Sequence, residues 1–551
     1  MLSCIYKIKL VLCVAILSHL LFSCTTSVPE KYTDSDAIPA IYPDYVDVTV
    51  PANIAPLHFH IEAEASDYVT RFTVGSESWT EGGQDVCLSF DDWHEIVAKA
   101  IAHNGDIDVE VFTATGDGQW TRHKPFAFHV SSDSIDPYIS YRLISPSYVT
   151  YEDLTINQRN LETYDETLIY GNMINGDEHN GQCINCHHTQ GGNPQRALFH
   201  VRQYLGGTVI NYDGNVSKID LKTDQTLSAG VYPAWHPTEP WVVFSTNLTS
   251  QTFHTRDIKK IEVQDAKSNL IFYDIKSNEV TPITSDSTDL ECFPTWSPDG
   301  KYIYFVSAHW ECLDSISQDL ELIRYSRDVQ YNLYRMPFDA ETRTFGEREL
   351  IYDAVARNRS VTFPRISPDG RFLMLTQGQS GVFHIWHNDA DLLLIELDKV
   401  QPVEPVTHPV ISHQSIRDMV GTLISDARVN ELSDSLRDVK ADKSPLPEGF
   451  RLISELNSPD VESYHSWSHT GQWIVFSTRR VDGNFTRPFI AHHDGNGHFT
   501  KPFELPQDNP QYHREFMRSY NIPEFMLGPV TIKPQEFAEI VRKNAKKANL
   551  K

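Results

Sequence analysis

One short pattern recurs four times in the second half of this chain, and it limits the possible folds more than any other feature. Each copy has an aromatic residue, then proline or histidine, and shortly afterwards tryptophan or isoleucine. A turn of the Pro-Asp-Gly type and a hydrophobic strand follow. The copies are YPAWHPTEPWVVFST (232–246), FPTWSPDGKYIYFVS (293–307), FPRISPDGRFLMLTQ (363–377) and YHSWSHTGQWIVFST (464–478).

Each copy predicts a β-hairpin of strand, tight turn and strand. In three of the copies glycine supplies the positive φ of the turn. Further strand-like pairs follow the copies, at 269–283, 331–353, 391–406 and 487–505. Two hairpins per repeat make a four-stranded sheet, which is the blade of a propeller. Residues 207–222 predict two more outer strands, whose inner partners come from elsewhere in the chain.

The repeat resembles the blade motif of TolB-like β-propellers over about residues 205–505. This resemblance implies an all-β propeller at 205–510, with about six blades and a range of five to seven. Residues 408–446 (including ISHQSIRDMVGTLISDARVNELSDSLRDV) predict a helical insertion.

The first part of the mature chain predicts a separate β-sandwich of the immunoglobulin-like type at 41–135. Alternating apolar and polar residues predict strands there, and only 91–103 has a helical pattern. Residues 24–40 are polar and predict a tether. Residues 136–204 are expected to link the two domains, and 511–551 to form a C-terminal segment.

The N-terminus has the features of an export signal over residues 1–23. Two lysines precede an apolar run from Leu10 to Phe22, which is short for a membrane span. The run ends in Leu21-Phe22-Ser23-Cys24, which resembles the lipobox of bacterial lipoproteins. The resemblance implies acylation of Cys24, the membrane as a partner through this anchor, and location at the outer membrane. The periplasmic face is favoured over the cell surface.

A cysteine motif supplies the main chemical signal. Cys183, Cys186 and His187 form C-x-x-C-H, the attachment motif of haem c, in which two thioethers hold the porphyrin and the imidazole is an axial iron ligand. Two other interpretations stay open. The cysteines can form a disulfide, or they can bind zinc together with His187 and His188.

The residues around this motif, 183–214, resemble a set of propeller lipoproteins of the cytochrome c type. The resemblance extends over nearly the whole mature chain and implies architecture and haem, but no reaction. It is carried by the stretches VPANIAPLHFHI (50–61), WHPTEPWVVFS (235–245), SQTFH (250–254), VFHIWHNDADL (382–392) and SYNIPEF (519–525).

A sixth iron ligand would decide between electron transfer and small-molecule chemistry. His188 is a poor candidate because it follows His187 directly. The candidates are His200, His254, His384, His387, Met517 and Met526.

Two functions remain in view. The first is electron transfer or redox sensing by a single c-type haem. The second is a non-catalytic binding or scaffold protein of the envelope, with a protein partner. A net charge of −27 argues against nucleic acid as a partner. No G-x-S-x-G elbow or phosphate-binding glycine loop is present, so an enzyme is the less favoured interpretation.

Overall fold

The computed structural model describes residues 26–146, 153–177, 179–253, 261–286, 288–310, 321–322, 325–405 and 445–551. The signal region and Cys24 lie outside these residues, as does the expected insertion at 408–446 apart from its last two positions. The chain divides into two compact units. One comprises the residues up to Asp47 together with Pro56–Val130, and the other comprises Val48–Ala55 and Ser131–Lys551.

The described residues of the first unit form two β-sheets and one helix, α2 (Phe90–His103), which lies where the sequence has its helical pattern. Ser89 caps the helix by accepting a hydrogen bond from the Asp92 backbone N–H. Trp93 is fully buried and packs edge-on against Phe128 of the sheet. The strands are β1 (Thr33–Asp34), β5 (Asp67–Val74), β6 (Glu77–Gly82), β8 (Asp106–Ala114), β9 (Trp120–Arg122) and β10 (Phe126–Ser131) in one sheet, and β2 (Ile41–Tyr42), β4 (Phe59–Ile61) and β7 (Asp85–Val86) in the other.

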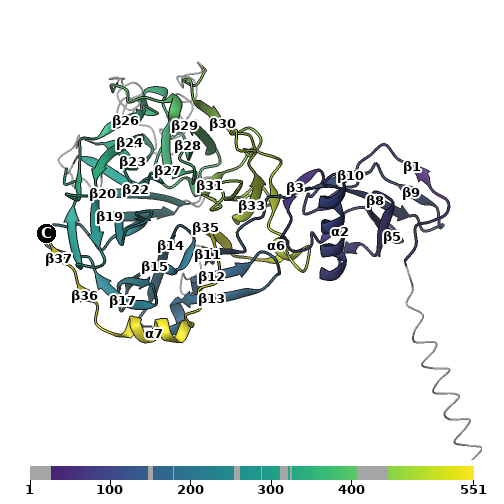
Figure 1. Cartoon of the computed structure of the whole chain (residues 1–551), viewed down its shortest axis with the longest axis horizontal. Helices are drawn as coiled ribbons and strands as arrows, with labels where there is room; N and C mark the ends of the chain where they lie inside the picture. Colours follow the sequence, from purple (N-terminus) through teal and green to yellow (C-terminus); the bar gives the residue numbers. More distant parts are fainter. Residues whose placement is uncertain are drawn as a thin grey trace, which may run out of the picture. The chain divides into compact units, whose positions relative to one another are not determined.

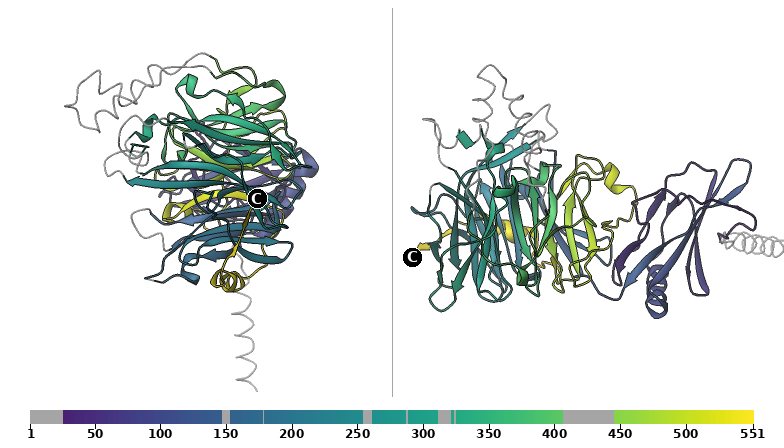
Figure 2. Two further views of the ribbon diagram at one scale, coloured as in Figure 1. Left: turned by 90° about the vertical axis from the view of Figure 1, so that its left-hand side faces the viewer. Right: turned by 90° about the horizontal axis from the view of Figure 1, so that it is seen from above.

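The second unit is a propeller of six blades. Figure 1 shows the sheets around a common axis, and Figure 2 gives two further views of them. Blades 3 and 4 are joined by one parallel bridge between Ser268 and Leu290. From blade 2 onward, the inner strand comes first in the sequence. Blade 2 consists of β14 (Gln182–Gln190), β15 (Asn193–Gln203), β16 (Gly207–Tyr212) and β17 (Asn215–Asp220), and blade 3 of β18 (Val231–Trp235), β19 (Trp241–Phe253), β20 (Ile261–Asp274) and β21 (Glu279–Pro282). Blade 4 consists of β22 (Asp289–Trp296), β23 (Tyr302–His309), β24 (Asn332–Asp339), β25 (Thr344–Phe345) and β26 (Glu349–Tyr352). Blade 5 consists of β27 (Ser360–Ile366), β28 (Phe372–Gly378), β29 (Asp391–Glu396) and β30 (Phe450–Leu452), and blade 6 of β31 (Glu462–Trp467), β32 (Trp473–Thr478), β33 (Arg487–His492) and β34 (Phe503–Glu504).

Blade 1 closes the ring, because it combines strands from both ends of this unit. Its outer three strands are β11 (Tyr138–Ile144), β12 (Thr155–Asn160) and β13 (Glu166–Gly171). Its inner strand is β35 (Ser519–Met526), which pairs with β11 in antiparallel fashion. Figure 1 shows the yellow β35 beside the blue β11 and β12.

This closure changes two expected boundaries. The segment 136–204, expected to be a linker, forms β11 to β15, and the expected C-terminal segment contains β35. The inner partners of the strands at 207–222 are therefore β14 and β15, which come directly before them. The propeller extends from Tyr138 to Met526. The repeat does not reveal blades 1 and 2, because their inner strands lack the aromatic residue followed by proline.

The same backbone irregularity occurs in the inner strand of every blade. Pairing with the second strand skips two residues each time, and the first skipped residue has a φ of 47° to 54°. Such a bulge turns two consecutive side chains out of the regular alternation. The skipped pairs are Ile522-Pro523, Cys186-His187, Tyr232-Pro233, Phe293-Pro294, Phe363-Pro364 and Tyr464-His465 in blades 1 to 6.

Several short elements complete the second unit. Helix α7 packs Phe537, Ala538 and Val541 into the apolar core formed by blades 1 and 2. Among the helices in the described ranges, none combines the length and hydrophobicity needed to span a bilayer. The short elements that complete the second unit are α6 (Tyr512–Glu515), α7 (Pro534–Arg542), β3 (Val48–Pro51), β36 (Lys546–Lys547) and β37 (Asn549–Leu550). The 3-10 helices are η2 (Asn172–Ile174), η3 (Ser326–Asp328), η4 (Val355–Arg357), η5 (His384–Trp386) and η6 (Leu397–Lys399).

Candidate functional site

The C-x-x-C-H motif lies in β14, the inner strand of blade 2, and includes the bulge of that strand. Asn185 pairs with His200 and His188 pairs with Leu198, so Cys186 and His187 are the two skipped residues. Cys186 therefore takes the place of the aromatic residue of the repeat, and His187 takes the place of the proline. The motif is thus a divergent copy of the blade pattern.

His187 has a close structural counterpart in His465 of blade 6. The Nε2 atom of His465 lies 2.9 Å from the carbonyl oxygen of Met374, in the second strand of the preceding blade. His187 is 6% exposed and lies beside Ser140, in the second strand of its own preceding blade. Burial lowers the pKa of His187 to about 4 and that of His465 to about 3. Both rings are therefore neutral packing groups at neutral pH.

The two cysteines of the motif are free thiols. Cys186 is 4% exposed, and its thiol lies beside the Tyr232 backbone of blade 3. Burial raises the pKa of the Cys186 thiol, although the positive charges of Arg202 and Arg142 act against this shift. Cys186 is therefore protonated at neutral pH and is a weak nucleophile.

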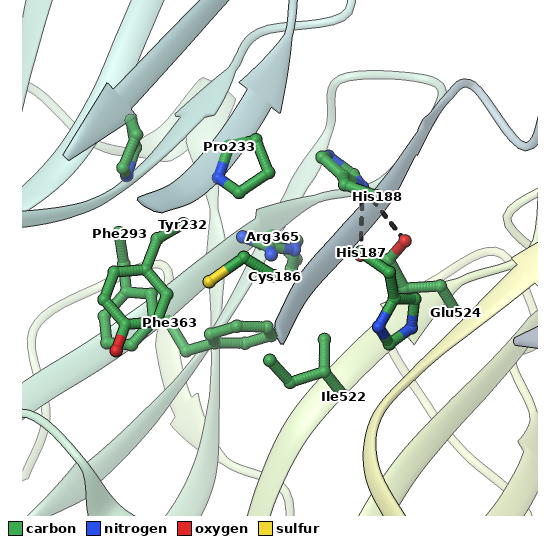
Figure 3. A pocket seen from close by; sticks show the side chains of 11 residues that line it. Cys186, His187, His188, Tyr232, Pro233, Phe293, Phe363, Arg365, Ile522 and Glu524 are labelled. Atoms are coloured by element: carbon green, nitrogen blue, oxygen red, sulfur yellow. Dashed lines mark hydrogen bonds and ion pairs between the residues drawn. The ribbon is translucent and has the colours of Figure 1, made fainter. Parts of the chain in front are cut away.

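These residues do not fit a covalently attached haem. Two thioethers and an axial imidazole must reach one porphyrin from the same side. Figure 3 shows Cys186 and His187 on opposite sides of strand β14. The thiol of Cys186 faces blade 3, whereas His187 faces blade 1. In the part of the chain that the structure describes, no three His, Cys, Asp or Glu side chains are grouped so that they could hold a metal ion.

The inner-strand bulges bring a ring of side chains to the axis of the propeller. The aromatic rings of blades 3 to 6 touch in sequence, with centroid distances of 4.5 Å for Tyr232 and Phe293, 5.3 Å for Phe293 and Phe363, and 5.0 Å for Phe363 and Tyr464. Blades 1 and 2 place the smaller Ile522 and Cys186 at the same positions. A narrow cavity of about 10 Å³, room for about one water molecule, lies beside them, and we call it the channel cavity (Figure 3).

Charged groups line the channel cavity beside this apolar ring. His188 forms an ion pair with the buried Glu524 at 2.9 Å. Although burial alone would raise the pKa of Glu524, its pKa is lowered because His188 and other positive groups lie near it. Arg365 also lines the cavity, and its guanidinium carbon lies 3.9 Å from the centre of the Phe363 ring. Burial lowers the pKa of Arg365 to about 10.

The candidate sixth ligands do not form one group. His200 is buried in β15, where its Nδ1 lies 3.1 Å from the Thr208 hydroxyl, and burial lowers its pKa to about 3. His387 lies 3.1 and 3.2 Å from the carboxylate oxygens of Glu262, and its ring packs against His384. Met517 is exposed.

Met526 is the one candidate that shares a cavity with His187. This second cavity lies beside β14, has a volume of about 20 Å³, and is lined mainly by apolar residues. His254 lies outside the described residues.

The charged residues Arg365 and Glu524 of the channel cavity were not among the site residues predicted from the sequence. Both occupy the position directly after the skipped pair, in Phe363-Pro364-Arg365 and Ile522-Pro523-Glu524. Two further copies of the repeat are Cys186-His187-His188 and Ile522-Pro523-Glu524. Their alignment with the other four copies would have identified the six residues at the propeller axis and the charged residues next to them.

Comparisons with known proteins give distant structural likenesses. TolB from Acinetobacter baumannii is 12% identical over 79% of this chain and 85% of that chain, with a TM-score of 0.40. Kuenenia stuttgartiensis hydrazine synthase is 11% identical over 85% of this chain and 99% of that chain, with a TM-score of 0.31. A luciferin-regenerating enzyme is 10% identical over 66% of this chain and 94% of that chain, with a TM-score of 0.33. No protein-family model and no curated protein matches the sequence.

Proposed function

We propose that this chain is a lipid-anchored binding protein of the bacterial envelope, and that the channel cavity is its binding site. The observation that supports this most is the break in the apolar ring at Cys186 and Ile522. Four blades fill the axis with aromatic rings, whereas these two blades leave space that charged side chains line.

Catalysis has less support than binding. Cys186 is the only thiol that lines the channel cavity, and burial keeps it protonated. The His188 imidazole is engaged by Glu524, 2.9 Å away. Nucleophilic catalysis requires a base next to the nucleophile, and this pairing does not supply one. Electron transfer through haem has no support from the geometry of Cys183, Cys186 and His187.

A blocked variant tests this function. Ile522→Phe places an aromatic ring at a position where four blades already carry one, so the backbone accepts it while the cavity fills. A thermal-shift screen of small molecules of varied charge should give compounds that stabilise the wild-type protein and not the I522F variant. Leu527→Phe is the matched control, because Leu527 is 45% exposed and outside the cavity. The proposal fails if every stabilising compound acts equally on wild type and I522F.

A further inference from the structure

Residues 542–551 (RKNAKKANLK) carry five basic side chains and no acidic one. We call these five cations the basic belt: Arg542, Lys543, Lys546, Lys547 and Lys551. No ten-residue stretch before Arg542 holds more than three Arg or Lys residues, and the chain as a whole has a net charge of −27. The basic belt is therefore the strongest local run of positive charge in an acidic sequence.

Backbone pairing holds this segment against the outer strands of blades 2 and 3. Strand β36 pairs in parallel with β17, which sets Lys547 opposite Asp220, and β37 pairs in parallel with β21. Between these two short strands, Ala548 is 4% exposed and packs into an apolar core formed by blades 2 and 3. Figure 1 shows α7, β36 and β37 in succession along the outside of the propeller. The fold thus fixes the basic belt on the outer surface of the propeller.

The basic belt is exposed and takes no part in ion pairing. All five side chains belong to exposed residues, and none lies within 4.0 Å of a carboxylate among the described residues. Arg542 donates to the Asn175 side-chain oxygen at 2.8 Å, which is a neutral partner. By contrast, the partly exposed Lys399 of blade 5 has a carboxylate partner in Glu396 at 2.8 Å. The propeller positions the charges of the basic belt without using them internally.

The arrangement of these charges suits a flat anionic partner. Ten extended residues span at most roughly 35 Å, so the cations form a line along the surface instead of a pocket. Four of the five are lysines, which act as flexible point charges, whereas recognition of single carboxylates on a protein favours the fixed fork of arginine. At physiological salt, exposed charges act over about 8 Å, so the basic belt dominates over more distant acidic residues at its own surface.

We propose that the basic belt is a second membrane contact, which binds the phosphodiester head groups of anionic phospholipids. It would act together with the lipid on Cys24 and is independent of the channel cavity. Each Lys or Arg close to an anionic lipid surface raises the affinity about fivefold. Because the contact is electrostatic, a salt wash should release a chain that lacks the acyl anchor, while the acylated chain stays with the membrane.

The test uses the mature protein with Cys24→Ser, so that no acyl chain contributes, and co-sedimentation with vesicles near physiological salt. The C24S protein should bind vesicles that contain phosphatidylglycerol and not vesicles of phosphatidylcholine alone, and binding should fall as salt is raised. In this background, the combined change Lys543→Gln, Lys546→Gln and Lys547→Gln should weaken binding at least about tenfold.

The matched control is the combined change Lys31→Gln, Lys124→Gln and Lys301→Gln in the same background. It removes the same charge at exposed residues elsewhere in the chain, and it should bind like the C24S protein. Should the first triple variant fail to fold, Lys551→Gln lies outside both short strands and should still weaken binding about fivefold.

Three results would overturn the membrane contact. The first is no binding of the folded C24S protein to phosphatidylglycerol vesicles. The second is an equal loss of binding in the two triple variants, since the attraction would then follow net charge and not the basic belt. The third is tighter binding of soluble polyglutamate than of phosphatidylglycerol vesicles, which would identify an acidic protein as the partner instead.

Discussion

His187 in blade 2 and His465 in blade 6 occupy the same position of the blade repeat, each buried beside the second strand of the preceding blade. Only one of the two follows a cysteine, so the position itself does not imply an iron ligand. Four blades place proline there, which indicates that this position serves packing.

The two histidines predict how stability depends on pH. Their folded pKa values, about 4 and about 3, lie below the ordinary 6.5, so the unfolded chain takes up protons first as the pH falls. Their contribution is complete above about pH 6.5 and is lost below it, at up to about 1.4 kcal/mol per pH unit for each histidine. His187→Pro should therefore make the decline in unfolding free energy between pH 6 and 4.5 shallower by about 1 kcal/mol per unit, as measured by urea unfolding.

The control for this experiment is His498→Gln, because the His498 side chain is 70% exposed. It should leave the pH slope unchanged. An H187P variant with the full wild-type slope would show that His187 is not a buried neutral group.

The geometry of the cysteine motif predicts the absorption spectrum. Protein made in a host with haem c maturation should show no Soret band after denaturing purification, because Cys186 and His187 face opposite sides of β14. The Cys183→Ala, Cys186→Ala double variant should have the same spectrum and should still fold. A covalent Soret band in wild type that disappears in the double variant would restore the haem interpretation.

Blade 1 should depend strongly on its borrowed strand. Tyr520 of β35 is fully buried and contacts Tyr141 of β11 with a ring-centroid distance of 4.7 Å. Tyr520→Ala should lower the unfolding free energy by about 3–5 kcal/mol, as for other large aromatic residues in cores. Tyr204→Ala, at a 42% exposed position, should change it by less than about 0.5 kcal/mol. Equal effects in denaturant unfolding would argue against closure of the ring through β35.

Cys24 predicts membrane attachment. Cys24→Ser should move the protein from the membrane fraction to the soluble fraction and abolish labelling by a fatty-acid analogue. Cys87→Ser changes an exposed cysteine and should alter neither result. Labelling that persists in C24S would place the lipid on another residue.

The propeller was predictable because four hairpins share the order of an aromatic residue, a turn and a hydrophobic strand, and three of the turns contain glycine (Gly300, Gly370 and Gly471). In Pro298-Asp299-Gly300, glycine adopts a φ of +70°, as the pattern predicted. The β-rich first domain and the helix at 91–103 were also evident, because strand and helix have different periods.

Blades 1 and 2 were not predictable in the same way. Ile522 and Cys186 stand where an aromatic residue is expected, and pairing of β35 with β11 joins residues nearly four hundred positions apart. The C-x-x-C-H spacing pointed to haem because it is a local pattern. The bulge that turns Cys186 and His187 to opposite sides arises only when β14 pairs with β15, and a local pattern does not show that pairing.

Closure through β35 has a consequence for the order of events in biogenesis. A ring that needs residues 519–526 cannot be complete while the C-terminal part of the chain is still in the ribosome or a translocation pore. Until then the β11 edge of blade 1 lacks its partner strand. The strand that seals the propeller is therefore among the last parts of the chain to be synthesised.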